Sequence, residues 1–297
     1  MLTYFQAIVM GLLQGVTELF PVSSLGHSVL LPSLLGGRWH ALARAQARPE
    51  SFFLAFLVGL HVATALALLV FFRREWVRIV RGLVRSARRR RIETSDERLG
   101  WLLVVATIPA GLTGVLLEHT LRTVFAKPLA AAVFLMVNGV ILGLGERVRH
   151  RAEVRALAIR EGVEPDGGRR LDTLDVREAG VIGTAQVLSL FAGISRSGIT
   201  MVAGLARGLD HEDAARFSFL LATPIILAAG VYKLPDLFGP LGDGIRGQVL
   251  VGSLCSAAAA YVAVRFLIRW FETRTLTPFA VYCFVAGAAA AVRFGVF

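Results

Sequence analysis

The chain has 297 residues, of which 55% are hydrophobic and 18% charged, and its mean hydropathy is +0.65. Soluble globular domains carry about 25% charged residues, so this composition excludes an ordinary soluble protein. The formal net charge of +11 comes almost entirely from arginines between long apolar segments, which indicates a membrane protein and excludes a nucleic-acid partner. We therefore predict a single membrane domain over residues 1–297.

The apolar segments fall into two kinds, continuous and broken. The first broken segment, 1–35, is interrupted at Pro21, which lacks a backbone N–H and disfavours helix at the residue before it. The second, 179–207, is interrupted at Gly193. Broken segments are tolerated in a membrane where they line a protein-enclosed cavity, so we expect two re-entrant helical hairpins. Six continuous runs reach the roughly 20 residues that span a bilayer: 52–72, 99–118, 126–146, 213–233, 246–268 and 276–296.

Two connecting segments are rich in arginine. Residues 73–98 contain ten arginines and residues 147–177 contain eight. Two predicted spans separate these segments, so both lie on one side of the membrane, which the positive-inside rule makes the cytoplasm. We interpret 73–98 as a solvated loop, although its arginines would also suit anionic lipid. Both chain ends and the start of the first hairpin then lie outside, whereas the second hairpin starts from the cytoplasm.

An internal repeat relates the two broken segments. When residues 11–28 are shifted by 172 they fall on 183–200, and four glycine, glutamine and serine positions coincide. Each half then holds one hairpin and three spans, an odd number of crossings, which predicts an inverted-topology repeat. The predicted division is repeat one at 1–146, a cytoplasmic linker at 147–177 and repeat two at 178–297.

The second hairpin contains the sequence LFAGISRSGIT, from Leu190 to Thr200. An arginine at bilayer depth costs roughly 2.5–3.5 kcal/mol on insertion scales, so we expect Arg196 to face an internal cavity and to have a partner. A helix that restarts near Ser195 would offer free N–H groups to an anion. We predict an anion clamp; the alternative is an arginine that snorkels to the lipid surface. The predicted substrate-binding residues of this hairpin are Ser195, Ser197, Gly198 and Thr200.

The first hairpin contains the sequence QGVTELFPVSSLGH, from Gln14 to His27. Gln14 and Glu18 are four residues apart and share a helix face, and Ser24 and His27 share a face of the helix that restarts after Pro21. A carboxylate, a hydroxyl and an imidazole can supply a nucleophile and a proton shuttle, and arginine binds phosphate in bidentate geometry. We predict Glu18, Ser24, His27 and Arg196 as catalytic, Gln14 and Ser23 as substrate-binding, and Glu18 as a ligand for a divalent metal.

These residues also have structural interpretations. Glu18 would neutralise Arg196 as a buried pair. Ser23 and Ser195 fit helix caps better than chemistry. The spacing leaves open whether Ser24 or His27 is the nucleophile. His61 has no partner nearby in the sequence, and we interpret it as a histidine of the core.

The two motifs, with FSFLLATPIILAAG and NGVILGLGE, resemble the undecaprenyl-diphosphate phosphatases of the BacA type over most of the chain. The resemblance implies an all-α integral membrane fold of six spans and two re-entrant hairpins, usually as a homodimer. It implies hydrolysis of undecaprenyl diphosphate to undecaprenyl phosphate and inorganic phosphate in the bacterial inner membrane, which recycles the lipid carrier of the cell wall and is associated with bacitracin resistance. It also implies a divalent cation, Mg²⁺ or Ca²⁺, and an active site on the external face. The family's functional residues fall on Gln14, Glu18, Ser23, Ser24, His27, Ser195, Arg196, Ser197 and Thr200.

The chain departs from the family pattern at two positions. Gln14 stands where the family has the first member of an acidic pair, which leaves one carboxylate in the hairpin, and Ala192 stands where many members have proline. A second class of function is a transporter or flippase of an anionic prenyl lipid, with the same clamp and no bond cleavage. The group of Glu18, Ser24 and His27, which simple binding would not require, favours the enzyme.

Overall fold

The computed structural model describes residues 2–46, 51–125, 127–159 and 170–296. The elements assigned to these residues are helices, and six of them are long and apolar enough to cross a membrane. All six coincide with the predicted runs, so the prediction of an all-α multi-pass membrane protein is confirmed. The spans are Phe52–Phe71, Ser95–Leu117, Pro128–Arg151, His211–Lys233, Arg246–Phe271 and Thr277–Gly295.

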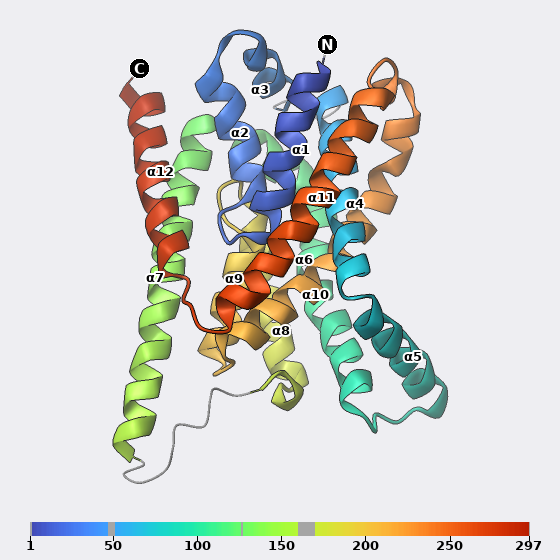
Figure 1. The fold of residues 1–297 in the computed structure, drawn as a ribbon, viewed down its shortest axis with the longest axis vertical. Helices are drawn as coiled ribbons and strands as arrows, with labels where there is room; N and C mark the ends of the chain where they lie inside the picture. Colours follow the sequence, from blue (N-terminus) through green and yellow to red (C-terminus); the bar gives the residue numbers. More distant parts are fainter. Residues whose placement is uncertain (1, 47–50, 126, 160–169, 297) are drawn as a thin grey trace.

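Figure 1 shows the helices in chain order. They are α1 (Tyr4–Leu19), α2 (Ser24–Leu35), α3 (His40–Gln46), α4 (Phe52–Phe71), α5 (Arg73–Arg89), α6 (Ser95–Phe125), α7 (Pro128–Ile159), α8 (Val176–Ala185), α9 (Arg196–Ala206), α10 (His211–Phe238), α11 (Arg246–Phe271) and α12 (Thr277–Val296). Four short 3₁₀ helices connect them: η1 (Gly37–Trp39), η2 (Leu171–Thr173), η3 (Gln186–Leu190) and η4 (Pro240–Gly242).

Helices α1 and α2 meet at a turn near the middle of the molecule (Figure 1). Helix α1 ends at Leu19 because Pro21 follows, and α2 begins at Ser24 behind the N-cap residue Ser23. The hydroxyl of Ser23 accepts the N–H of Gly26 at 3.2 Å. The backbone of Ser23 has a φ of 69°, a region that residues with a side chain rarely occupy. The first break therefore lies where the sequence predicts it.

Helices α8 and α9 meet at a second turn, also near the middle of the molecule (Figure 1). Gly193 in this turn has a φ of 113°, and a Cβ there would lie 2.5 Å from the carbonyl oxygen of Ala131, so the backbone requires glycine. Helix α9 begins at Arg196 behind the N-cap residue Ser195, whose hydroxyl accepts the N–H of Gly198 at 3.1 Å. The second break and the restart near Ser195 also lie where the sequence predicts them.

The two turns have matching caps. The pairs Ser23–Gly26 and Ser195–Gly198 are separated by the same 172 residues that relate the two motifs. Helices α1 and α8 also both begin with a capping box. In this motif the side chain of the N-cap residue accepts the backbone N–H of the residue three positions later, and the side chain of that later residue accepts the backbone N–H of the N-cap residue. These boxes, Thr3–Gln6 and Asp175–Glu178, have the same offset, because 175 − 3 = 172.

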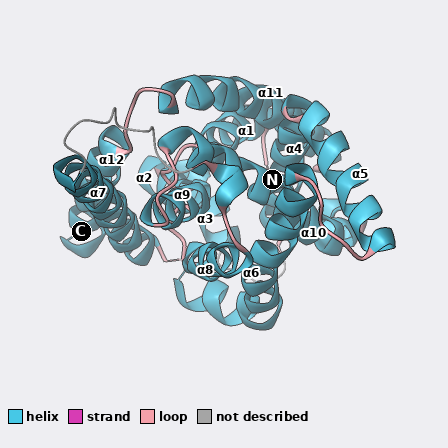
Figure 2. Cartoon of the chain, turned by 90° about the horizontal axis from the view of Figure 1, so that it is seen from below, coloured by secondary structure: helices cyan, strands magenta, loops and turns pink. Residues whose placement is uncertain are grey.

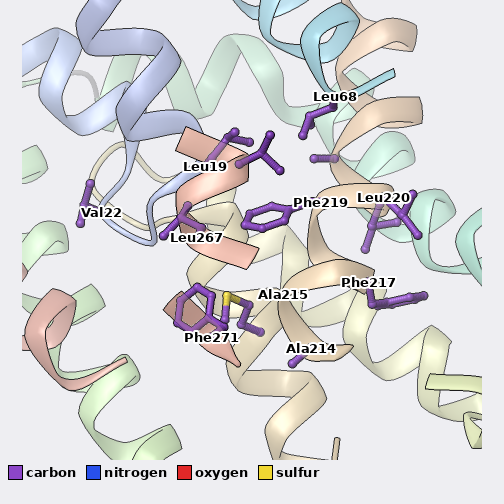
Figure 3. Close-up of a cluster of buried hydrophobic side chains, with 14 of the residues drawn as sticks. Leu19, Val22, Leu68, Ala214, Ala215, Phe217, Phe219, Leu220, Leu267 and Phe271 are labelled. Atoms are coloured by element: carbon purple, nitrogen blue, oxygen red, sulfur yellow. The ribbon is translucent and has the colours of Figure 1, made fainter. Parts of the chain in front are cut away.

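The longer helices surround α2 and α9 when the molecule is seen along its long axis (Figure 2). Helix α1 packs against α11, α8 packs against α6, α4 packs against α10 and α11, and α7 packs against α12. Buried side chains from these helices form the core in Figure 3, where Leu19, Leu68, Phe219, Leu267 and Phe271 are each at most 2% exposed. This packing fixes the end of α1, and with it the first turn, against the body of the protein.

The described parts of the arginine-rich segments, 73–98, 147–159 and 170–177, lie at one end of the molecule, opposite both termini (Figure 1). The expectation of a loop over 73–98 was wrong in part, because 73–89 form helix α5. Its buried positions, Glu75, Ile79, Gly82 and Ser86, recur every three or four residues, which is the period of a helix that packs on one face. In the predicted linker, α7 continues to Ile159, and the stretch 160–169 lies outside the described residues.

Candidate active site

Glu18 and Arg196 form an ion pair between the two hairpins. Glu18 lies in the last turn of α1, and its Oε1 accepts a hydrogen bond from the guanidinium of Arg196, the first residue of α9. The Glu18 side chain is 6% exposed and that of Arg196 is 14% exposed. A second guanidinium nitrogen donates to the carbonyl oxygen of Ala222 at 3.2 Å. The arginine therefore points inward to a partner 178 residues earlier and does not snorkel to the lipid.

Three further side chains contact the second oxygen of the Glu18 carboxylate, Oε2. The Ser24 hydroxyl donates to Oε2, and the Gln14 amide donates to the same atom at 2.9 Å. His61 Nε2, from α4, lies 3.4 Å from Oε2. Ser24 is the first residue of α2, so the turn at Pro21 returns its hydroxyl to the carboxylate at the end of α1. The structure therefore brings together Gln14, Glu18, Ser24 and Arg196 from the predicted set.

The interpretation of His61 as a histidine of the core was wrong. Its side chain is 28% exposed and its Nε2 faces the Glu18 carboxylate. Sequence distance hid this contact, because 43 residues separate the two side chains (61 − 18 = 43). A signal was present, since His61 is an ionisable residue within the apolar span Phe52–Phe71, and such residues are functional by default.

His27 lies away from this group. Its Nδ1 contacts the carbonyl oxygen of Ser23 at 2.7 Å, and its Nε2 contacts the hydroxyl of Tyr282 in α12 at 2.8 Å. The two rings also stack, with centroids 5.8 Å apart. A carbonyl oxygen can only accept, so Nδ1 carries a hydrogen, and Nε2 lies within hydrogen-bond distance of the Tyr282 hydroxyl. The hydrogen bonds of His27 within the described chain therefore go to Ser23 and Tyr282, and Glu18 and Ser24 are not among its partners.

Direct hydrogen bonds join the two turns. The Ser23 hydroxyl accepts the N–H of Gly193 at 3.2 Å. The Asn138 amide donates to the carbonyl oxygen of Pro21 at 2.9 Å and accepts the N–H of Ser195 at 2.9 Å. Asn138 is fully buried on α7, so one side-chain amide connects the two turns and fixes their relative position.

The remaining predicted residues lie in the first turn of α9. The Ser195 hydroxyl lies 3.0 Å from that of Ser197, and the Thr200 hydroxyl lies 2.7 Å from that of Ser218. The N–H of Ser195 is bound by Asn138 and that of Gly198 by the Ser195 hydroxyl. A helix leaves its first N–H groups without intrahelical partners, so within the described part of the chain the N–H groups of Arg196 and Ser197 remain available to an anion.

Replacing Asn138 by alanine should destabilise the protein, because it leaves the Ser195 N–H buried without a partner and leaves the Pro21 carbonyl with only the weak donor Cys283 Sγ, 3.7 Å away. We expect the free energy of unfolding to fall by about 2–4 kcal/mol, with reduced activity. Thermal unfolding in detergent measures the loss of stability, and the rate of turnover measures the loss of activity. Ser86→Ala is the matched control, because it removes the buried bond from Trp101 at 2.9 Å near the arginine-rich end. Equal losses of activity in the two variants would contradict a specific role for Asn138.

The oxygen atoms around Glu18 determine how a divalent cation would fit the site. Glu18 is the one carboxylate in contact with Ser24 and Arg196, and the described residues contain no group of three His, Cys, Asp or Glu side chains able to hold a metal. The oxygens of Glu18, Gln14 and Ser24 are hard ligands of the kind that Mg²⁺ and Ca²⁺ prefer. Since Mg²⁺ typically binds through one or two carboxylates together with substrate phosphates, these residues fit a cation shared with a phosphate ligand.

Together, the fold and these contacts define a multi-pass membrane protein with an internal carboxylate, serine and arginine, a set suited to a phosphate group. The model of the family described as bacitracin resistance protein BacA matches residues 7–289, and the chain belongs to this family.

Curated relatives agree over nearly the whole chain. The chain is 61% identical to the undecaprenyl-diphosphatase of Mycolicibacterium paratuberculosis, over 98% of this chain and 97% of that protein. It is 57% identical to undecaprenyl-diphosphatase 2 of Frankia alni, over 99% of each chain. It is 45% identical to undecaprenyl-diphosphatase 2 of Burkholderia thailandensis, over 94% of this chain and 93% of that protein.

Proposed function

We propose that this protein is a membrane phosphatase that hydrolyses undecaprenyl diphosphate to undecaprenyl phosphate and inorganic phosphate. One observation carries the proposal: in a chain of the BacA family, the Ser24 hydroxyl donates directly to a buried carboxylate that also holds Arg196. The names of the relatives support the substrate. The product is the lipid carrier of bacterial cell-wall synthesis, so the reaction recycles that carrier.

The phosphate is held by Arg196 and the start of α9. Guanidinium has five N–H donors in a planar fork, and two of its nitrogens contact Glu18 and Ala222. The terminal phosphate of the substrate competes with Glu18 for the Arg196 guanidinium. Binding of the substrate therefore releases the Glu18 carboxylate from Arg196. The N–H groups of Arg196 and Ser197 add donors at the positive end of the helix dipole.

Ser24 attacks the terminal phosphorus. Its Oγ–H proton passes to the Glu18 carboxylate, an Oγ–P bond forms, and the bond from phosphorus to the bridging oxygen breaks, which releases undecaprenyl phosphate. Water then attacks the phosphoserine, the Oγ–P bond breaks, Ser24 recovers a proton and inorganic phosphate leaves. Arg196 stabilises the charge on the equatorial oxygens in both steps.

The two turns form re-entrant hairpins in the inner membrane. The inverted repeat is supported by the matched caps and by the way α1 packs on α11 while α8 packs on α6. The arginine-rich end then faces the cytoplasm, and both termini face outward. The site opens to the external side through the first hairpin, and the chain forms a homodimer, as the family resemblance implies.

Glu18 would be the protein's carboxylate ligand for a divalent cation, Mg²⁺ or Ca²⁺, that binds together with the diphosphate. It would neutralise phosphate charge. Treatment with EDTA should therefore lower phosphate release by about 10²-fold or more, and excess Mg²⁺ or Ca²⁺ should restore it. EDTA already saturated with Ca²⁺ is the control for effects of the chelator itself. An undiminished rate in EDTA would show that the reaction needs no free cation.

The test of the proposed function is release of inorganic phosphate from undecaprenyl diphosphate by the purified protein in detergent.

The second candidate is a transporter or flippase of an anionic prenyl lipid, which the paired hairpins favour, because broken helices meeting at the midplane are common in transporters. A phosphatase releases phosphate in detergent, where there are no leaflets to cross. A flippase moves labelled lipid between the leaflets of vesicles and releases none.

A further inference from the structure

Helix α5 has an apolar stripe on the face that points away from the protein. Its buried positions recur every three or four residues and face the rest of the chain. Val77, Val80 and Val84 are instead 46%, 50% and 47% exposed, and their spacing of three and four residues places them on one side of the helix. Val77 and Val84 each lie two residues from a buried position, which is a rotation of about 200° around a helix. The exposed valines therefore lie on the side of α5 opposite its buried face.

Two arginines beside this stripe carry charge that the described chain does not neutralise. Arg81 follows Val80, and Arg88 lies seven residues further on (88 − 81 = 7), so both lie on the same side of α5. Both side chains are exposed, and neither has a hydrogen bond or an ion pair with a described residue. Arg85, in contrast, pairs with Glu97 at 2.6 Å. Arg81 and Arg88 are therefore free to bind an anion.

The valines and the arginines line one open hollow on the surface of α5. Its volume is about 470 Å³, and it is lined by Val80, Arg81, Val84, Arg85, Arg88 and Arg89. The planar guanidinium group binds phosphate oxygens in bidentate geometry, whereas the valines offer only apolar contact. The hollow therefore suits a ligand that has a phosphate group next to an apolar part.

Helix α5 lies at the depth at which the apolar spans begin. It follows the span of α4 after a single residue, at the arginine-rich end of the molecule (Figure 1). Leu83 packs on Gly100, since a Cβ there would lie 2.5 Å from Leu83 Cγ, and the indole N–H of Trp101 donates to the Ser86 hydroxyl at 2.9 Å. Gly100 and Trp101 stand at the start of the apolar run 99–118, and tryptophan is enriched where a membrane meets water. The hollow therefore lies at the level of lipid headgroups.

We propose that this face of α5 binds an anionic phospholipid of the cytoplasmic leaflet. The lipid phosphate lies at Arg81 and Arg88, and the apolar part of the lipid covers Val77, Val80 and Val84. In the proposed orientation the arginine-rich end faces the cytoplasm, where anionic lipids attract basic segments at the membrane surface. A second copy of the chain fits this face less well, because two such faces would bring unpaired arginines together. The inference goes beyond the proposed phosphatase function and does not depend on it.

The test is native mass spectrometry of the full-length protein in detergent, titrated with phosphatidylglycerol and, as a reference, with phosphatidylcholine that has the same chains. Arg81→Gln with Arg88→Gln should lower the affinity for phosphatidylglycerol by about 30-fold and leave that for phosphatidylcholine unchanged. Arg90→Gln with Arg91→Gln is the matched control, because it removes the same charge past the last turn of α5 and should keep the parent affinity. An affinity for phosphatidylglycerol that is equal in the parent and in the Arg81 and Arg88 variant would overturn the inference.

A second pair of substitutions tests the apolar stripe. Val80→Ser with Val84→Ser keeps every charge and should also lower the affinity for phosphatidylglycerol, because the lipid loses its apolar contact. If these substitutions instead dissociate a dimer and leave lipid binding intact, the face belongs to a second copy of the chain. If inorganic phosphate displaces the lipid from the parent protein, the arginines bind a free anion. Either result would overturn the inference.

Hydrogen exchange of the parent protein gives a measurement that needs no variant. In nanodiscs of phosphatidylcholine, addition of phosphatidylglycerol should slow exchange of the backbone amides of α5, whereas the amides of α9, within the protein, provide the reference. Exchange of α5 that is the same with and without phosphatidylglycerol would also overturn the inference.

Discussion

Arg196→Ala is expected to lower kcat/KM for undecaprenyl diphosphate by about 10³-fold or more and to abolish detectable binding of the lipid. The arginine supplies a planar set of donors to phosphate in a buried site, where removing a single transition-state donor already costs about 10²–10³-fold. Arg196→Lys keeps the charge without the fork geometry, so we expect an intermediate loss. Phosphate release and binding of a radiolabelled lipid in detergent measure the two effects.

The same variant removes the guanidinium that pairs with the buried Glu18 carboxylate, and breaking a buried ion pair in this way typically costs about 3–5 kcal/mol of stability. The double variant Glu18→Gln with Arg196→Ala removes both charges and should recover stability without recovering turnover. Arg74→Ala, an exposed arginine of α5, is the control for net charge. Turnover of Arg196→Ala at the parent rate would exclude the phosphate clamp.

Ser24→Ala is expected to lower kcat by about 10⁴-fold or more while binding of the lipid is retained, because the nucleophile is lost and Arg196 remains. Ser23→Ala, a change of the adjacent serine, is the matched control. It removes a helix cap and leaves the buried N–H of Gly193 without its partner, so it should lower the free energy of unfolding by about 2 kcal/mol while leaving the Ser24 nucleophile in place. Rates of phosphate release and thermal unfolding of both variants make the comparison.

The chemical form of the intermediate separates Ser24 from His27 as nucleophile. Acid quenching of the parent protein during turnover of lipid labelled in the terminal phosphate should trap an acid-stable phosphoserine at Ser24. An acid-labile phosphohistidine would instead assign the attack to His27 and would require the bond from His27 to Tyr282 to open first. In that case Tyr282→Phe should raise the rate.

The helices and their breaks could be predicted from local properties of the chain. Hydropathy locates the six spans, and the backbone constraints at Pro21 and Gly193 locate the two turns. The cost of an unpaired arginine in a membrane predicts that Arg196 has a partner, and the sequence offers Glu18 as a candidate for that partner. The offset of 172 residues also places Ser24 and Arg196 at equivalent positions, the first residues of α2 and α9.

The contacts that the sequence could not reveal join distant segments of the chain. The contact of His27 with Tyr282 depends on how α2 and α12 both pack against α7, and no local pattern encodes it. Asn138 is a single amide in a long apolar helix, and its bonds to Pro21 and Ser195 are defined only once both turns are in place. His61 could have been found by applying to it the rule that singled out Arg196.

The bonds between the turns also limit movement of solutes through the protein. For a headgroup to travel from one end of the helices to the other, Ser23 would have to release Gly193, and Asn138 would have to release Pro21 and Ser195. Each such bond contributes about 1 kcal/mol, and leaving its buried partners unpaired costs more. The bonds between the turns therefore hold the centre of the protein closed in this conformation, and passage of a headgroup would require all of them to break together.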